Sequence, residues 1–262
     1  MNFVTTRPER DFTIRSETHS DARRARGVAE SGMLETALIL GLLAMASSQD
    51  PHQAAAAPEV GIDHLILGVD DLKKGIESFA RATGVRPEFG GEHPGRGTAN
   101  ALVSLGHGRY LEILAPASKT AKLDPSWGDA FHPTLTPVGW ALHSRDLART
   151  VAQVRKAGLS VSDPQPGSRK RPDGTTLNWK TAALDGPQLD LHPFFIEWGA
   201  GTAHPSTTSP QGCELVRVAI TAPEPKSLRT LLHTVGVEVE VQQGAKAAMA
   251  FTLRCAKGEV TF

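Results

Sequence analysis

A segment rich in residues that could do chemistry runs from Gly90 to Pro116, with the sequence GGEHPGRGTANALVSLGHGRYLEILAP. Its histidines, arginines and glutamates are the residue types of phosphate loops, metal sites and small-molecule pockets. The glycines Gly91, Gly95 and Gly97 fit neither GxxxxGK[ST] nor GxGxxG, and a strand pattern rather than a helix follows them. A nucleotide-binding loop is therefore excluded, while a metal site and a small-molecule site stay open.

Composition excludes several other classes of function. The 262 residues carry 28 Lys and Arg against 28 Asp and Glu, so no domain-sized basic face is expected and nucleic acid is not an expected partner. The sequence contains no GxSxG or HExxH motif, which removes support for acyl-enzyme and zincin chemistry. Cys213 and Cys255 are the only cysteines and offer neither a zinc site nor a disulfide framework; one bridge between them is expected if the chain is exported.

The elements that must position these residues recur along the chain from residue 62. An apolar strand, an Asp turn and an amphipathic helix appear twice at an offset of 75 residues, which relates Asp71 to Asp146 and Leu72 to Leu147. Short strand-like segments follow each helix, and in the second unit we expect them around Ser160, residues 177–184 and residues 188–196. The pattern predicts two tandem βαβββ modules, and a fainter third copy follows them.

The domain boundaries follow from this repeat. Residues 59–262 form the ordered domain, divided into module one, module two and a partial third module that either completes the sheet or mediates a homodimer; their ranges are 62–116, 137–198 and 213–262. Residues 1–58 are predicted to be disordered or to form a signal and linker region. The location is cytoplasmic, or exported if the apolar residues 33–46 are a signal peptide.

Two such units resemble the vicinal oxygen chelate superfamily, and more narrowly its glyoxalase-like branch. The resemblance rests on IDHLILGV in the first strand, YLEIL in the fourth, the string HPGRGTAN, LHPFFIEWG at residues 191–199 and HPS at residues 204–206. It implies an α+β fold in which the paired modules form a half-open curved sheet, a cup, with the helices on the outside.

The resemblance also implies a divalent metal, Zn²⁺, Ni²⁺, Mn²⁺ or Fe²⁺, held by His64 on the first strand and Glu112 on the fourth. The alternation of the strand supports this, because it separates His64 from the apolar face that meets the helix. In the second module the offset of 75 places Gly139, which has no ligand atom, where a second histidine would stand. Asp190 or His192 is the candidate third ligand.

Further side chains are candidates for contact with the substrate. His93, Arg96 and Asn100 lie in the glycine-rich segment and are expected to reach the mouth of the cup and hold an anionic or carbonyl-bearing ligand. Trp179 and Phe194 belong to the closing strands of module two and are candidates to line an apolar pocket.

Two functions remain open from the sequence. In the first, the protein is an enzyme of lyase or isomerase type in which a metal stabilises an enediolate-like anion and Glu112 moves a proton. In the second, the same cup binds or sequesters a small molecule without metal, as resistance proteins of this superfamily do. The missing histidine at Gly139 favours the second function, and the pair of His64 and Glu112 favours the first.

Overall fold

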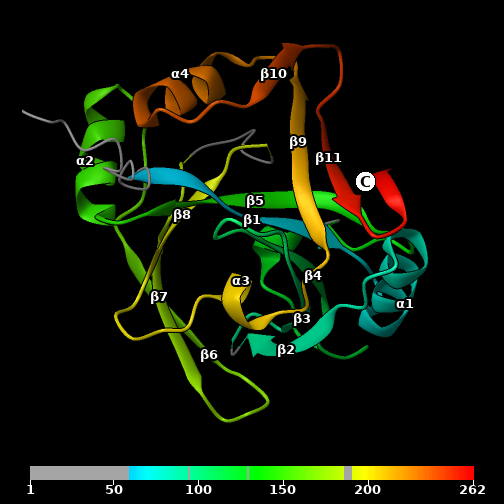
Figure 1. Ribbon diagram of the computed structural model, residues 1–262. Coiled ribbons are helices and arrows are strands. Elements are labelled where there is room, and N and C mark those ends of the chain that lie inside the picture. The colour runs from blue at the N-terminus through cyan, green and yellow to red at the C-terminus, as the bar shows by residue number, and fades with distance from the viewer. Residues whose placement is uncertain (1–58, 94, 129, 186–190) are drawn as a thin grey trace, which may run out of the picture. The chain divides into compact units, whose positions relative to one another are not determined.

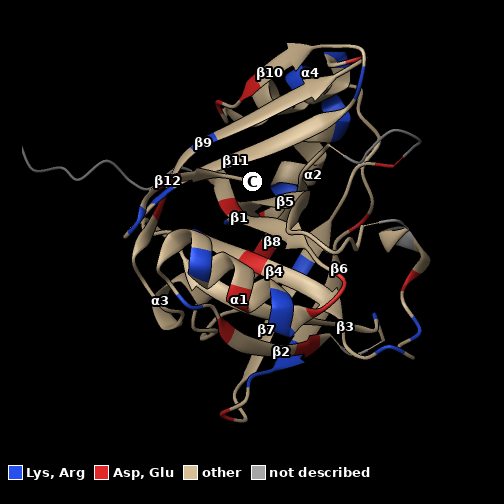
Figure 2. Cartoon of the chain, turned by 90° about the vertical axis from the view of Figure 1, so that its right-hand side faces the viewer, with Lys and Arg blue, Asp and Glu red and all other residues tan. Residues whose placement is uncertain are grey.

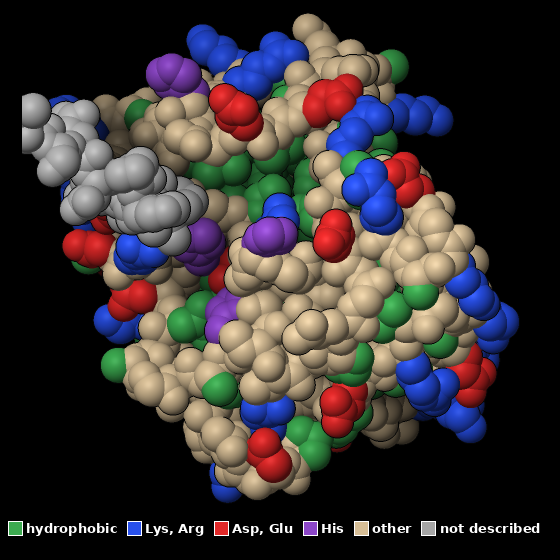
Figure 3. Space-filling model, in the orientation of Figure 1, with side chains coloured by type: hydrophobic (Ala, Val, Ile, Leu, Met, Phe, Trp, Pro, Cys, Tyr) green, Lys and Arg blue, Asp and Glu red, His purple; other side chains and the backbone are tan. Residues whose placement is uncertain are grey.

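The structure is a computed structural model, and it describes residues 59–93, 95–128, 130–185 and 191–262. The expectations for residues 1–58 and for Asp190 lie outside the described residues. Within the described part of the chain, no helix has the length and apolar content that a membrane crossing requires. Basic and acidic side chains are interspersed over the face shown in Figure 3, as the balanced composition predicts.

The first module has the predicted order of strand, helix and three strands. The turn before the helix contains an Asp that caps the helix, and turns that contain glycine separate the strands that follow it. The elements are β1 (Val60–Gly68), α1 (Leu72–Thr83), β2 (Glu88–His93), β3 (Thr98–Ser104) and β4 (Tyr110–Pro116).

The second module repeats this order, preceded by a short 3₁₀ helix at Pro125–Trp127. Its first strand after the helix lies later than expected, at Gln165–Lys170 rather than around Ser160, where only an isolated bridge at Val161 forms. The elements are β5 (Thr136–Ser144), α2 (Leu147–Lys156), β6 (Gln165–Lys170), β7 (Thr176–Ala182) and β8 (Phe194–Trp198), followed by the short helix α3 (Pro205–Thr208).

The two modules share one eight-stranded sheet in the order β2-β3-β4-β1-β5-β8-β7-β6. β1 and β5 pair antiparallel at its centre, while each runs parallel to the last strand of its own module, β4 or β8. The sheet curves until its edge strands β2 and β6 approach each other, and the Arg169 guanidinium on β6 donates a hydrogen bond to the Gly90 carbonyl on β2. The expected cup is confirmed, and it is nearly closed along this seam between β2 and β6 (Figure 1).

Equivalent aspartates begin the two module helices. The Asp71 carboxylate accepts a hydrogen bond from the Lys74 amide at 3.1 Å, and the Asp146 carboxylate accepts one from the Arg149 amide at 2.9 Å. Each bond satisfies an amide that the first helical turn leaves without a partner, which is worth about 1 kcal/mol. The repeat seen in the sequence therefore reflects the same helix start in both modules.

The third unit repeats the order of elements but not the strand pairing. It comprises a four-stranded sheet in the order β10-β9-β11-β12, in which the first strand runs parallel to the strand directly after the helix. It therefore does not extend the eight-stranded sheet. Its elements are β9 (Cys213–Ala222), α4 (Lys226–Val235), β10 (Glu240–Gln243), β11 (Ala248–Cys255) and β12 (Gly258–Thr261).

This third unit covers the helical side of the large sheet. α4 contacts α2, β12 contacts α1, and β11 contacts β5 (Figure 1). Leu231 and Phe251 are fully buried in the same apolar cluster as Phe79 of α1 and Trp140 of β5. Burial of each large apolar side chain contributes about 1.5–3 kcal/mol, so the third unit is part of the core that holds the cup in shape.

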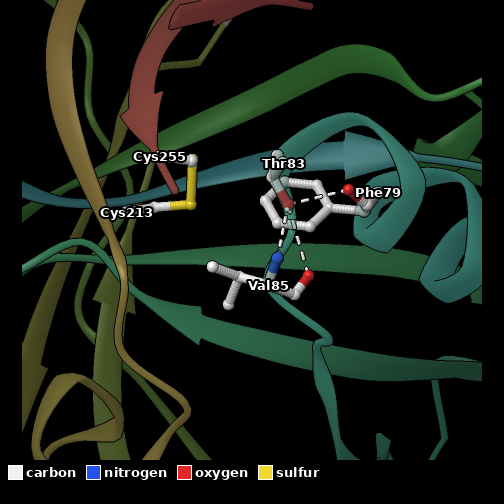
Figure 4. The surroundings of a disulfide bond; sticks show 5 residues. All are labelled: Phe79, Thr83, Val85, Cys213 and Cys255. Carbon is white, nitrogen blue, oxygen red and sulfur yellow. Dashed lines mark hydrogen bonds between the residues drawn. A yellow bond between two sulfur atoms is a disulfide. The ribbon is translucent and has the colours of Figure 1, made fainter. Parts of the chain in front are cut away.

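A disulfide between Cys213 and Cys255 joins the facing residues of β9 and β11. From the sequence, this bridge is expected if the chain is exported. Figure 4 shows it beside the end of α1, where the Thr83 hydroxyl donates to the Phe79 carbonyl at 2.8 Å and accepts from the Val85 amide at 3.1 Å. The bridge thus cross-links the two central strands of the third sheet, near the point where module one turns from its helix into β2.

Candidate functional site

A β-bulge in β1 places two neighbouring polar side chains on the inner face of the sheet. The register between β1 and β5 shifts between Ile62 and His64, and Asp63 has no partner across the ladder. Asp63 is only 1% exposed and His64 only 3% exposed. Strict alternation would have directed Asp63 toward the helix, so the bulge is what brings it to the site.

The Asp63 carboxylate fixes the orientation of His64. His64 Nδ1 lies 2.7 Å from Asp63 Oδ1, and Asp63 Oδ2 accepts from Trp198 Nε1 at 3.1 Å and from His204 Nε2 at 3.1 Å. Burial alone would raise the pKa of Asp63, but the hydrogen bonds from His204 and His64 hold it well below its usual range. An ionised carboxylate only accepts, so His64 carries its proton on Nδ1 and presents the Nε2 lone pair to the interior.

Glu112 on β4 faces this lone pair. Its Oε2 lies 3.8 Å from His64 Nε2, and its Oε1 accepts a hydrogen bond from Asn100 Nδ2 at 2.7 Å. Burial alone would raise the pKa of Glu112, but the His93 and His64 imidazoles and the Asn100 hydrogen bond lower it below its usual value. Figure 2 shows acidic residues on β1 and β4 in the body of the sheet, where Asp63 and Glu112 are buried.

His93 at the end of β2 completes the polar cluster. Its Nδ1 lies 3.0 Å from the Thr98 hydroxyl, and its Nε2 lies 3.4 Å from Asn100 Nδ2 and 3.7 Å from Glu112 Oε1. Burial lowers the pKa of His93, with Glu112 opposing the shift. The glycine-rich segment therefore supplies His93 and Asn100 to the same place as His64 and Glu112.

Aromatic rings enclose the His64 imidazole. Tyr110 stacks on it at a centroid distance of 4.5 Å, and Phe194 meets it edge-on at 5.4 Å. Burial raises the pKa of the Tyr110 phenol well above its usual value. His204, from the HPS segment, packs edge-on against Tyr110 at 5.5 Å, and its Nδ1 accepts from the Ser206 amide at 3.2 Å. The connection after β8 thus folds over the cluster and contributes His204 to it.

Three of the candidate residues lie elsewhere. Arg96 is exposed, with Nε 3.8 Å from Asp124 and its guanidinium 5.7 Å from the Trp127 ring. His192 Nε2 lies 2.9 Å from the Ser227 hydroxyl on α4, so its imidazole is directed to the third unit. Trp179 meets Trp198 edge-on at 5.7 Å, at the border of the aromatic group. Among the described residues, no group of three His, Cys, Asp or Glu side chains has the geometry to hold a metal ion.

Sequence reasoning missed Arg169, which is 4% exposed on the inner face of β6. Burial lowers the pKa of this guanidinium, and Glu112, followed by Tyr110, opposes the shift. The strand is QPGSRK, whose Pro and Gly make a poor strand signal and are tolerated because β6 is an edge strand. The alternation of Arg169 with the exposed Lys170 was the one signal that could have revealed an inward cation.

The comparisons with known proteins agree with this architecture. The family model of the glyoxalase-like domain matches residues 62–236, and the chain belongs to this family, within the vicinal oxygen chelate superfamily. A crystal structure of a hypothetical protein from Staphylococcus aureus superposes with a TM-score of 0.56 at 13% identity, covering 72% of this chain and 88% of that chain. This likeness shows the fold alone.

Methylmalonyl-CoA epimerases are among the more distant structural neighbours. The Mycobacterium tuberculosis enzyme gives a TM-score of 0.39 at 16% identity, covering 56% of this chain and 92% of that chain. A variant of the Streptomyces coelicolor enzyme in complex with 2-nitronate-propionyl-CoA gives a TM-score of 0.39 at 18% identity, covering 53% of this chain and 97% of that chain. No protein of curated function matches the sequence at a significant level.

Proposed function

We propose that the protein is an enzyme of the vicinal oxygen chelate type that binds a small oxygen-rich molecule inside the eight-stranded sheet and uses a divalent metal at His64 and Glu112. The observation that carries the proposal is the buried pair itself. His64 Nε2 and Glu112 Oε2 face each other at 3.8 Å across the parallel strands β1 and β4. A buried imidazole and carboxylate that do not hydrogen-bond directly leave room for a third partner between them.

The chemistry of these two donors fits a divalent ion. Asp63 holds His64 by Nδ1, which is the carboxylate–histidine arrangement that orients metal-binding imidazoles. The lowered pKa keeps Glu112 ionised near neutral pH. Two protein ligands leave positions for substrate oxygens, water and Asp190, the candidate third ligand outside the described residues. When bound, such an ion supplies Lewis-acid polarisation of a substrate oxygen.

The side chains around the pair assign the remaining roles. Glu112 can accept a proton at Oε2 when that oxygen is not bound to the ion, while Asn100 keeps its other oxygen engaged at 2.7 Å. His93 has a lowered pKa and is neutral near pH 7, so its Nε2, 3.7 Å from Glu112 Oε1, is a second proton acceptor. Tyr110 and Phe194 shield His64 from water by packing on its ring.

A metal-free binding or sequestering protein is the second candidate function. The absence of a third described ligand favours it, as does Gly139 at the position equivalent to His64 in module two. In this case the same polar cluster contacts the ligand by hydrogen bonds, and no proton needs to move.

Metal binding to the purified full chain separates the two functions. We expect the wild type to bind about one equivalent of Zn²⁺, Ni²⁺, Mn²⁺ or Fe²⁺ in equilibrium dialysis, and His64→Gln and Glu112→Gln to lose it. His107→Asn is the matched control, because His107 is an exposed histidine on the β3–β4 turn with φ 50°, which Asn tolerates. If the folded wild type binds none of the four ions, the metal-dependent function is excluded and the metal-free function stands.

A further inference from the structure

A separate cavity of about 150 Å³ lies at the seam between β2 and β6, beside α3. It is small compared with pockets for drug-sized molecules, which occupy roughly 300–1,000 Å³. Its lining comes from the two edge strands, from β3 and β7 beside them, from the β6–β7 turn and from α3, and includes Phe89, Gly90, Leu102, Arg169, Leu177 and Pro205. Its wall at Gly90 lies next to the Asn100 side chain, which belongs to the His64 cluster.

The cavity contains a buried cation whose donors are mostly unused. Arg169 is 4% exposed, and its one hydrogen bond to the described residues is the bond to the Gly90 carbonyl. No carboxylate of the described residues lies within ion-pair distance of it, although Glu112 acts on it from further away. A guanidinium has five N–H donors in a planar fork that matches a carboxylate, and a buried charge is costly when it has no partner.

Apolar surface lies next to this cation. Phe89 is 44% exposed, and it is one of two large hydrophobic residues in the described chain with this degree of exposure. Phe89 and the nearby Leu102, Leu177 and Pro205 line the cavity together with Arg169. A ligand that satisfied both surfaces would carry a negative charge at one end and a short apolar body at the other.

The acidic residues of the lining do not oppose this arrangement. Asp173 lies 3.7 Å from Arg171 Nε and accepts the Thr175 amide at 2.8 Å, so it already has partners. Glu88 also lines the cavity, but it is exposed, so water and salt screen its charge. The buried Arg169 therefore dominates the inner end of the cavity.

We propose that this cavity binds a small monocarboxylate with an apolar body, with the carboxylate on the Arg169 guanidinium and the body against Phe89. This goes beyond the proposed function, because it needs no metal and no reaction at His64. It assigns a ligand class to a site that the His64 cluster does not include.

Benzoate and its neutral analogue benzamide test the proposal by calorimetric titration of the full chain. We expect the wild type to bind benzoate at least tenfold more tightly than benzamide, because the charge-assisted bidentate contact needs a carboxylate. Arg169→Gln removes this preference. Phe89→Ala weakens both ligands severalfold, since the ring contacts the shared apolar body.

The controls separate this site from the metal site. Arg254→Gln, which alters an exposed ion pair with Glu259 in the third unit, leaves benzoate binding unchanged. His64→Gln abolishes metal binding under the proposed function but keeps the benzoate preference. Circular dichroism and thermal unfolding show whether each variant folds, and Phe89→Ala at the surface still tests the site if Arg169→Gln does not fold. Equal binding of benzoate and benzamide, or no binding of benzoate to the wild type at millimolar concentration, overturns the proposal.

Discussion

Replacing Asp63 by Asn tests whether the β-bulge residue sets the state of His64. In the wild type, Asp63 Oδ2 accepts from Trp198 and His204, and Oδ1 accepts from His64 Nδ1. His204 must donate from Nε2, because the Ser206 amide donates to its Nδ1. An Asn side chain can still accept the hydrogen bonds from Trp198 and His204 only if its oxygen takes the place of Oδ2. Its NH₂ group then faces His64 Nδ1.

The Asn NH₂ group and a protonated His64 Nδ1 would both be donors in this contact, and two donors cannot form a hydrogen bond. We therefore expect the proton of His64 to move to Nε2. The lone pair that faces Glu112 is then lost. The contact between the two side chains is kept, but the carboxylate charge that strengthened it is lost, and the difference between a charged and a neutral hydrogen bond is about 1–2 kcal/mol of unfolding free energy. For a domain of this size this lowers Tm by roughly 2–8 °C. Metal affinity should fall about 10- to 100-fold, as for other changes to the partner of a metal-binding histidine.

Nitrogen NMR of the histidine rings reports the tautomer directly, and metal titration of the same sample reports affinity. The matched control is Asp70→Asn, which makes the same change at an exposed residue of the turn before α1 and should alter neither quantity. An Asp63→Asn variant that is folded, keeps the proton on Nδ1 and retains wild-type metal affinity would refute the reasoning.

Three further changes test the parts of the fold that hold the site. Reducing the Cys213–Cys255 bridge, or replacing both residues by Ser, should cost about 4 kcal/mol for a loop of 42 residues, seen as a lower midpoint in urea; an unchanged midpoint would mean that the bridge does not constrain the unfolded chain. Leu231→Ala in α4 should cost about 2–5 kcal/mol, because it empties a fully buried position between the third unit and the cup, whereas a cost below about 1 kcal/mol would show that the unit packs only loosely. Asp146→Ala removes the cap of α2 and should cost about 1 kcal/mol in the same assay, and no loss would contradict the capping role.

The features that could be predicted from the sequence are those with a regular period. The offset of 75 residues indicated the paired modules, and the aspartates at equal positions, Asp71 and Asp146, cap equivalent helices. Alternation along two strands placed His64 and Glu112 on one face, and the structure brings them within 3.8 Å of each other. Periodic patterns persist because each strand must bury one face.

The features that escaped prediction break a period or depend on distant contacts. Asp63 reaches the inner face because of a bulge, which adds one residue to the strand and leaves no clear mark in the sequence. His204 joins the cluster through a contact across 141 residues, between a connecting segment and β1. The pairing order of the third sheet differs from that of the modules although its elements follow in the same order, because local sequence patterns do not specify which strands become neighbours.

The charges inside the cup connect the two proposed sites. Among the described residues, the buried carboxylates are Asp63 and Glu112, and Arg169 is the buried guanidinium, so these three groups carry a net negative charge. Such an interior repels an anion at long range and attracts a cation. A divalent ion between His64 and Glu112 would reverse the sign, and a carboxylate on Arg169 would then restore a balance. A metal at His64 and Glu112 would therefore strengthen the binding of an anion at Arg169, although the Arg169 site does not require that metal.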